Sequence, residues 1–108
     1  MLSEEYLTLR EKIEKILIET KEPLTVSQII SLLGLDPRDK KLVYNALEHI
    51  AKSIRRKSRE KLVLAMIPPI CRKCGYVFKD LDKPRKPSKC PKCKSERITE
   101  PKFKIIVR

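Results

Sequence analysis

The sequence is short of the residues on which most enzymes and membrane proteins depend. It contains one histidine, His49, and no apolar run near the ~18 residues that a membrane-spanning helix needs. His49 is the only histidine and lies on the flank of a predicted helix. We therefore interpret it as structural, which leaves a catalytic triad without a base. Residues 1–5 include acidic side chains where a signal peptide needs basic and apolar ones. We therefore expect a soluble, cytoplasmic protein that is not an enzyme.

Positive charge is in large excess and unevenly placed. The chain has 26 basic and 14 acidic residues, a formal net charge of +12. Residues 1–20 hold three basic and five acidic residues, whereas residues 61–108 hold fourteen basic and four acidic ones. Such a field favours a polyanionic partner, with good solubility as the plainer alternative, and we predict double-stranded DNA rather than a small-molecule substrate. The high charged fraction, with one Asn and one Gln, is typical of thermophile proteins.

All four cysteines lie in one stretch, as two pairs of equal spacing. Cys71-Arg-Lys-Cys74 and Cys90-Pro-Lys-Cys93 are separated by fifteen residues. Each Cys-x-x-Cys turn aims two sulfurs at one point, so that two turns supply the four ligands of a closed tetrahedral zinc site. Two disulfides are disfavoured without a secretion signal, and a redox pair is disfavoured by the duplicated spacing. We predict one structural Zn²⁺.

The residue after each cysteine pair distinguishes the two predicted metal loops. Gly75 follows the first pair, where a positive φ lets backbone N–H groups point at the sulfurs. Lys94 follows the second pair, so this loop must contain a left-handed non-glycine residue or turn differently. Cys-x-x-Cys-Gly-Tyr (71–76) and Cys-Pro-x-Cys (90–93) resemble the metal loops of rubredoxins and rubredoxin-like zinc ribbons, with Lys94 as the departure. The resemblance implies iron as the alternative metal; the short spacer, basic charge and absence of tryptophan favour zinc.

Capping signals predict two helices in the first third of the chain. Ser3 is a candidate N-cap, and apolar residues at helical spacing predict a helix to about Thr20. A capping box, Thr25-Val-Ser-Gln28, starts a second helix. Gly34 is placed to end that helix in the left-handed conformation.

A third helix is predicted over residues 37–56, with Asp36 as its cap. With the second helix and the short glycine-containing turn, it forms a helix-turn-helix. Its predicted inward face is Val43, Ala46, Leu47, Ile50 and Ile54. At 100° per residue, the opposite face is Arg38, Lys41, Asn45, Glu48, Lys52, Arg56 and Arg59.

Two apolar segments that flank the cysteines need each other as partners. Residues 62–67 and 102–107 are predicted to pair as an antiparallel hairpin, with the zinc ribbon inserted between them. Within the ribbon, residues 76–78 and 97–99 are predicted strands. Tyr76, Phe78 and Phe103 are expected to fill its core, with stacking on nucleic-acid bases as the alternative. The alternative is a ribbon appended to a complete domain, with residues 103–107 as its own third strand.

The predicted order of helices and hairpin resembles the winged helix-turn-helix fold. With the ribbon, it is similar to archaeal predicted transcriptional regulators that join a helix-turn-helix to a zinc ribbon. The resemblance implies an α+β fold in which residues 1–67 are the winged helix-turn-helix with the first wing strand, 68–100 the zinc ribbon and 101–108 the returning wing strand. It also implies sequence-directed DNA binding through the third helix.

Basic and amide side chains on the third helix and the ribbon are the candidate DNA contacts. Arg38, Lys41 and Asn45 are candidate base readers, since Arg and Asn are the usual bidentate partners of guanine and adenine. The alternatives are a solvated helix face and, on the ribbon, cations that offset the thiolates. Glu48 would oppose phosphate. The candidate nucleic-acid-binding residues are Arg38, Lys41, Asn45, Lys52, Arg55, Arg56, Arg59, Lys73, Arg85 and Lys86.

These observations predict a DNA-binding transcriptional regulator. A protein-interaction module of the transcription or RNA machinery, which docks through the helices, is the second hypothesis. Its motivation is the acidic segment 1–20 beside a basic remainder. Rubredoxin-like electron transfer by iron is the third. An enzyme is disfavoured because four thiolate ligands leave no open coordination position.

Overall fold

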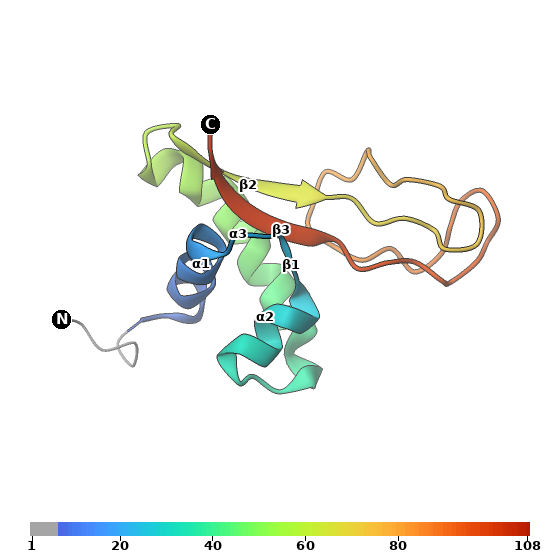
Figure 1. Cartoon of the computed structure of the whole chain (residues 1–108), viewed down its shortest axis with the longest axis horizontal. Helices are drawn as coiled ribbons and strands as arrows, with labels where there is room; N and C mark the ends of the chain where they lie inside the picture. Colours follow the sequence, from blue (N-terminus) through green and yellow to red (C-terminus); the bar gives the residue numbers. More distant parts are fainter. Residues whose placement is uncertain (1–6) are drawn as a thin grey trace.

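The computed structural model describes residues 7–108. The fold is α+β, as predicted, with three α-helices, a three-stranded antiparallel sheet and an arm that holds the cysteines (Figure 1). The elements are α1 (Leu9–Glu19), β1 (Leu24–Thr25), α2 (Val26–Leu33), the 3₁₀-helix η2 (Pro37–Asp39), α3 (Lys40–Lys57), β2 (Leu62–Ile67) and β3 (Lys102–Val107). Within this part of the chain, no helix has the length and apolar character needed to cross a membrane.

Helix α1 begins later than the sequence pattern predicts. Thr8 is its N-cap: the Thr8 hydroxyl accepts a hydrogen bond from the Glu11 N–H at 3.2 Å, and the Glu11 carboxylate accepts one from the Thr8 N–H at 3.1 Å. This reciprocal capping box fixes the first turn and lowers the pKa of Glu11. The predicted start at Ser3 is therefore wrong, and Ser3 itself lies outside the described residues.

The predicted turn between the second and third helices is confirmed, with one change. Thr25 and Gln28 form the expected capping box, and Gly34 ends α2 in the left-handed conformation with φ 66°. The Asp36 carboxylate accepts a hydrogen bond from the Arg38 N–H at 2.8 Å. The third helix was predicted to start at Pro37, but its first turn is the 3₁₀-helix η2, and α3 begins at Lys40.

The sheet confirms the pairing of the two segments that flank the cysteines. In the β2–β3 hairpin, Leu62 lies opposite Val107 and Ile67 lies opposite Lys102. β1 adds to the other edge of β3, which gives the order β1-β3-β2, a contact that the sequence did not predict. Residues 68–101, the arm, therefore leave from the end of β2 and return to the start of β3, and in Figure 1 most of the arm extends beyond the helices.

Two separate apolar clusters stabilise the chain. The larger lies between the helices and the sheet, and its buried members include the five inward residues predicted for the third helix. Phe103 is fully buried there, edge-to-face with Tyr44 at 6.4 Å between ring centroids. The expectation that Phe103 fills the ribbon core is therefore wrong, because its position on β3 faces the helices. The smaller cluster is in the arm: Cys71, Phe78, Cys90 and Ile98, with Tyr76, Leu81 and Cys93 packed against them.

The arm has less regular structure than predicted. Residues 76–78 and 97–99 were expected to be strands, but each contributes one isolated bridge, Ile70 with Val77 and Cys71 with Ile98. Further backbone hydrogen bonds hold these segments, from the Cys71 N–H to the Tyr76 carbonyl at 2.8 Å and from the Thr99 N–H to the Ile70 carbonyl at 2.9 Å. Because a ladder this short cannot stabilise itself, the arm depends on its small cluster and its cysteines.

Candidate metal centre and nucleic-acid interface

The two cysteine loops have the same backbone shape. In the first, the Gly75 N–H donates to the Cys71 carbonyl at 2.9 Å, and in the second the Lys94 N–H donates to the Cys90 carbonyl at 2.9 Å. The residue after each pair is left-handed, with φ 79° at Gly75 and φ 65° at Lys94. Of the two options for Lys94, the structure shows the left-handed one, so the second loop retains its shape at the cost of an unfavourable non-glycine conformation.

The two loops bring all four predicted metal ligands together. The four sulfurs of Cys71, Cys74, Cys90 and Cys93 lie within 4.8 Å of one another. Across the loops, the Cys71 and Cys93 sulfurs are 3.5 Å apart and the Cys74 and Cys90 sulfurs 3.6 Å apart. A tetrahedral ion with Zn–S bonds of about 2.3 Å separates its sulfurs by ~3.8 Å, so the quartet fits Zn²⁺. The four cysteines are free thiols, which does not support the alternative of two disulfides.

The backbone of each loop favours the thiolate, the form that binds metal, at the first cysteine of the pair, whereas the neighbouring thiols raise the pKa of Cys74. The N–H groups of Cys74 and Lys73 point at the Cys71 sulfur, and they lower the pKa of Cys71 to about 6. Burial raises the pKa of Cys90, but N–H groups from Cys93 and Lys92 and the thiols of Cys74 and Cys93 together lower it, and the net direction is downward. Backbone dipoles therefore stabilise negative charge at the first cysteine of each loop before any cation is counted.

The outer face of α3 is open to solvent, as the sequence predicted. Lys41, Asn45, Lys52 and Arg56 are all exposed along it. Arg59 does not belong to this face: the helix ends at Lys57, and Arg59 lies in a following turn with φ 55°. Extrapolating 100° per residue past the helix end placed Arg59 wrongly.

Two of the candidate arginines already have acidic partners. The Arg38 guanidinium binds Asp36 at 2.9 Å, and this contact holds the pKa of the Asp36 carboxyl below its ordinary value. Arg55 lies 2.9 Å from Glu60, which also pairs with Arg108. All of these groups are well exposed, so solvent screens the pairs, although Arg38 holds the Asp36 carboxylate through both Nε and Nη2.

Glu48, which the sequence marked as an obstacle to phosphate, has two cationic neighbours. Lys52 on the same helix lies 3.8 Å from its carboxylate, and Lys83 in the arm lies 3.6 Å from it. Lys52 follows from the i,i+4 spacing, whereas no local signal identifies Lys83 because the contact spans 35 residues. The negative charge at the centre of the outer face is therefore offset.

The ribbon cations divide into two groups. Lys73 and Arg85 are exposed on the arm. Lys86 lies at a cleft between the arm and the start of α3, together with Lys40, Arg72 and Arg97. Lys40 and Arg97 were not among the predicted contacts, because only the tertiary structure places the arm beside α3.

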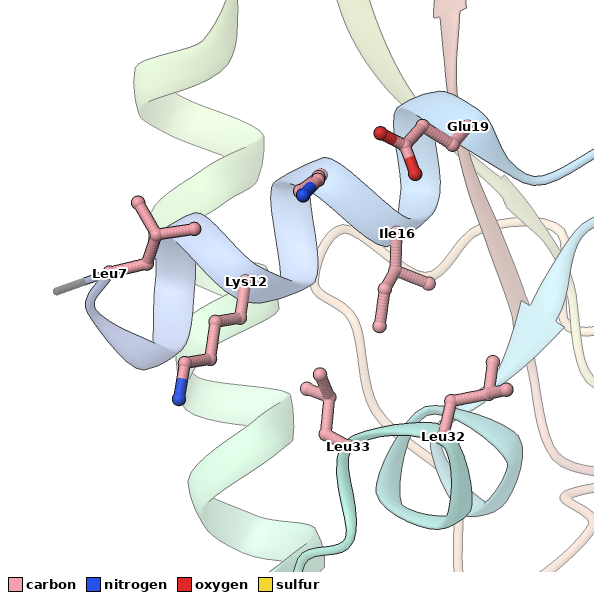
Figure 2. A pocket seen from close by; sticks show the side chains of 7 residues that line it. Leu7, Lys12, Ile16, Glu19, Leu32 and Leu33 are labelled. Atoms are coloured by element: carbon pink, nitrogen blue, oxygen red, sulfur yellow. The ribbon is translucent and has the colours of Figure 1, made fainter. Parts of the chain in front are cut away.

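A different surface lies between α1 and α2 (Figure 2). It is a pocket of about 260 Å³ in which Ile16 of α1 faces Leu32 and Leu33 of α2, and Lys12 lies at its edge. Leu32 is 63% exposed, a high value for a leucine. His49, interpreted from the sequence as structural, is exposed in another groove, between α1 and α3.

Comparisons with known proteins match the chain to two family models, and the second match begins at the first residue of the arm. Residues 8–63 match a family model described as PF0610-like, N-terminal, and residues 68–108 match one described as the PF0610 rubredoxin-like zinc beta-ribbon domain. The chain is similar to a solved structure, the solution NMR structure of protein PF0610 from Pyrococcus furiosus. The two share 41% identity over 89% of this chain and 86% of the other, with a TM-score of 0.70. None of the curated proteins matches.

Proposed function

We propose that this chain, which belongs to the PF0610-like family, is a transcriptional regulator that binds double-stranded DNA. In this proposal α2, η2 and α3 are the helix-turn-helix, and the β2–β3 hairpin is a wing into which the zinc ribbon is inserted. The order of elements supports this interpretation, since the hairpin follows directly after α3 and pairs in one register along its whole length. The solved relative is archaeal, in line with the resemblance from the sequence.

One observation carries the proposal: a cationic face of α3 with its acidic centre neutralised. Lys41 and Asn45 are exposed in the first half of the helix, and Lys52 and Arg56 continue the face towards its end. In helix-turn-helix proteins the first half of the recognition helix contacts base edges, while flanking cations contact phosphates. We assign Arg38, Lys41 and Asn45 to base contacts and the remaining candidates to the backbone.

The metal has a structural role in this proposal. Four thiolates complete a tetrahedral coordination sphere, so a zinc ion held by them has no open position for a substrate. What it supplies is a fixed geometry for an arm whose own apolar cluster is small. The backbone of the arm, which carries Lys73 and Arg85, then keeps one conformation when DNA binds.

Duplex binding tests the proposal. Fluorescence anisotropy with labelled duplex DNA at several salt concentrations should show affinity falling steeply with salt, by close to one unit of log–log slope for each phosphate contact. Asn45→Ala should reduce the preference for a selected site over random duplex, by about 1–3 kcal/mol. Lys21→Gln, an exposed charge between α1 and β1 that is not among the candidate contacts, is the control. Weak binding that salt does not change would contradict the proposal.

The pocket between α1 and α2 favours a second candidate, a docking surface for a protein of the transcription machinery. Its floor is apolar, and its lining contains two lysines, Lys12 and Lys15, against one carboxylate, Glu19. The occupant we propose is therefore an amphipathic helix with acidic residues beside its apolar face. Calorimetric titration should show an acidic amphipathic peptide binding, and a basic peptide with the same apolar face binding more weakly. Leu32→Ser should abolish the difference. Equal or absent binding of both peptides would reject this candidate.

A further inference from the structure

The cleft between the arm and the start of α3 brings together cations from four parts of the chain. It measures about 520 Å³, and its lining residues are Lys40, Arg72, Lys86, Glu96, Arg97, Ile98, Thr99 and Glu100. Four of these side chains are cationic and two are carboxylates. Lys40 is the first residue of α3, and Arg72 is within the first cysteine loop. The excess of positive charge is therefore local, not only a property of the whole chain.

Backbone contacts fix the two segments of the arm that carry Arg72 and Arg97. The Arg72 N–H donates to the Arg97 carbonyl at 2.7 Å, which holds the two arginines on adjacent segments. Their neighbours Cys71 and Ile98 pair across the same bridge and are buried in the arm cluster. Two guanidinium groups are thus presented from a backbone that the metal loop stabilises, and this reduces the entropy lost when they bind an anion.

Neither carboxylate of the cleft forms an ion pair with these arginines. Glu96 lines the cleft and is exposed, so two carboxylates stand against four cations, and Glu100 has other partners. Glu100 accepts a hydrogen bond from the Ser27 hydroxyl at 2.8 Å and lies 3.8 Å from Lys40. These contacts direct its charge towards α2 and α3. Within residues 7–108, neither Arg72 nor Arg97 has a carboxylate within ion-pair distance. Two exposed guanidinium groups without an acidic partner face one cleft, an arrangement that matches a phosphate.

We propose that this cleft holds the sugar-phosphate backbone of a DNA duplex that lies against α3. The inference rests on the proposed function and extends it, because it assigns the arm a direct contact with the phosphate groups of DNA. Lys40 marks the end of α3 at which Arg38 and Lys41 are placed, so a strand in the cleft runs beside the bases proposed for those residues. Arg72, Arg97 and Lys86 contact phosphates there, and the ribbon therefore acts as a clamp on the backbone rather than as an obstacle to docking.

Paired charge-removal variants test this. Arg72→Gln with Arg97→Gln removes two cations from the cleft. Lys61→Gln with Lys79→Gln is the control, since it removes two exposed cations that do not line the cleft. At ~0.1 M salt the cleft variant should bind duplex roughly 10-fold more weakly for each phosphate that it no longer neutralises, and its log–log salt slope should become shallower by about 0.9 per phosphate. The control should weaken binding much less, and the effect should be the same for specific and random duplexes.

Each outcome decides one question. Equal weakening in the two variants would mean that only net charge matters, and the cleft assignment would be overturned while duplex binding by α3 stood. Salt-insensitive binding by the unmodified protein would overturn the proposed function itself. Because Arg72 adjoins a metal ligand, zinc content is measured in every variant, and Lys40→Gln with Arg97→Gln provides a second pair away from the ligands. If that pair kept full affinity and slope, the proposal would be wrong.

Discussion

The Lys83 ammonium lies 3.6 Å from the Glu48 carboxylate, and this contact joins the arm to the middle of α3. Glu48 is the one acidic side chain in the predicted outer face of the helix, and Lys52 approaches it from the same helix. Lys83 is 61% exposed and Glu48 32% exposed, so the pair contributes little to stability. Its effect is on the surface potential: the arm supplies the cation that offsets the charge least suited to a DNA-binding face.

Removing Lys83 should therefore lower the affinity for duplex DNA while changing the free energy of unfolding little. For Lys83→Gln we expect a change of less than about 1 kcal/mol in the free energy of unfolding. Duplex affinity should fall, and Glu48→Gln should raise it, because the outer face loses its negative charge. The double variant should resemble Glu48→Gln alone, which denaturation curves and anisotropy titrations can measure as a cycle. If Glu48→Gln weakened duplex binding, the outer face would not be the contact surface.

Chelation should unfold the arm and leave the helical unit intact. The arm cluster contains three of the four cysteines, whereas the larger core contains none of them. Removing the metal therefore removes the arm's main support, while α1, α2, α3 and the sheet keep their own core. Amide exchange should lose protection in the arm only, and metal analysis should give one zinc per chain in a colourless sample. A red sample that bleaches on reduction would instead indicate iron, and loss of helical signal would show that the two units depend on each other.

Gly75 and Lys94 hold equivalent positions, so exchanging their residue types should change metal affinity in opposite directions. Gly75→Ala meets no atom within 4 Å of the added Cβ, and the penalty is conformational, about 1–2 kcal/mol for a left-handed alanine. Competition with a chelator should show zinc binding roughly 5- to 30-fold weaker. Lys94→Gly should strengthen it, by up to a few-fold after the entropy cost of glycine.

Gly34 provides the matched control, because it is also left-handed, at φ 66°, but caps α2 outside the ribbon. Gly34→Ala should lower the stability of the helical unit and leave zinc affinity unchanged. An equal loss of zinc affinity in the Gly34 and Gly75 variants would show that the effect does not arise in the metal loop.

Local signals in the sequence were enough to predict most of the elements and the metal site. The capping box at Thr25, the left-handed Gly34 and the thiol quartet each depend on residues a few positions apart or on a strongly specified spacing. The hairpin that encloses the ribbon was also predictable, since its two apolar segments needed partners. Errors arose where two local signals competed: Thr8-x-x-Glu11 caps α1 in place of Ser3.

Contacts between distant segments could not be predicted. Nothing in the local sequence around Lys83 indicates that it reaches Glu48, nor that Glu100 binds Ser27 across 73 residues. Such contacts follow from where the hairpin directs the arm, and that direction depends on the whole sheet. For the same reason Lys40 and Arg97 were left out of the predicted site, although each is an exposed cation.

Tyr44 gives a test of the core beneath the proposed interface. Its hydroxyl is buried and finds no hydrogen-bond partner among residues 7–108, while its ring packs edge-to-face on Phe103. Tyr44→Phe keeps the ring and removes the unpaired hydroxyl, so it should raise the free energy of unfolding at neutral pH by about 1 kcal/mol. Tyr44→Leu is the contrasting variant: it also removes the hydroxyl but gives up the edge-to-face packing on Phe103, and it should be destabilising. A loss of stability in Tyr44→Phe would show that the hydroxyl has a partner, such as a bound water.

Tyr44→Phe should also change how the free energy of unfolding depends on pH in the alkaline range. Burial, with a smaller contribution from the negative charge of Glu100, raises the pKa of Tyr44 from 10.0 to about 12 in the folded state. Below pH 10 the phenol is protonated in both the folded and the unfolded chain, so it adds no pH dependence. Between pH 10 and pH 12 the unfolded chain releases the proton and the folded chain keeps it, and stability therefore falls as pH rises through this window. Denaturation of the zinc-loaded protein should show a smaller alkaline loss in Tyr44→Phe than in the unmodified chain, with the lysines and other tyrosines contributing equally to both. Parallel curves for the two proteins would show that the Tyr44 pKa is not raised.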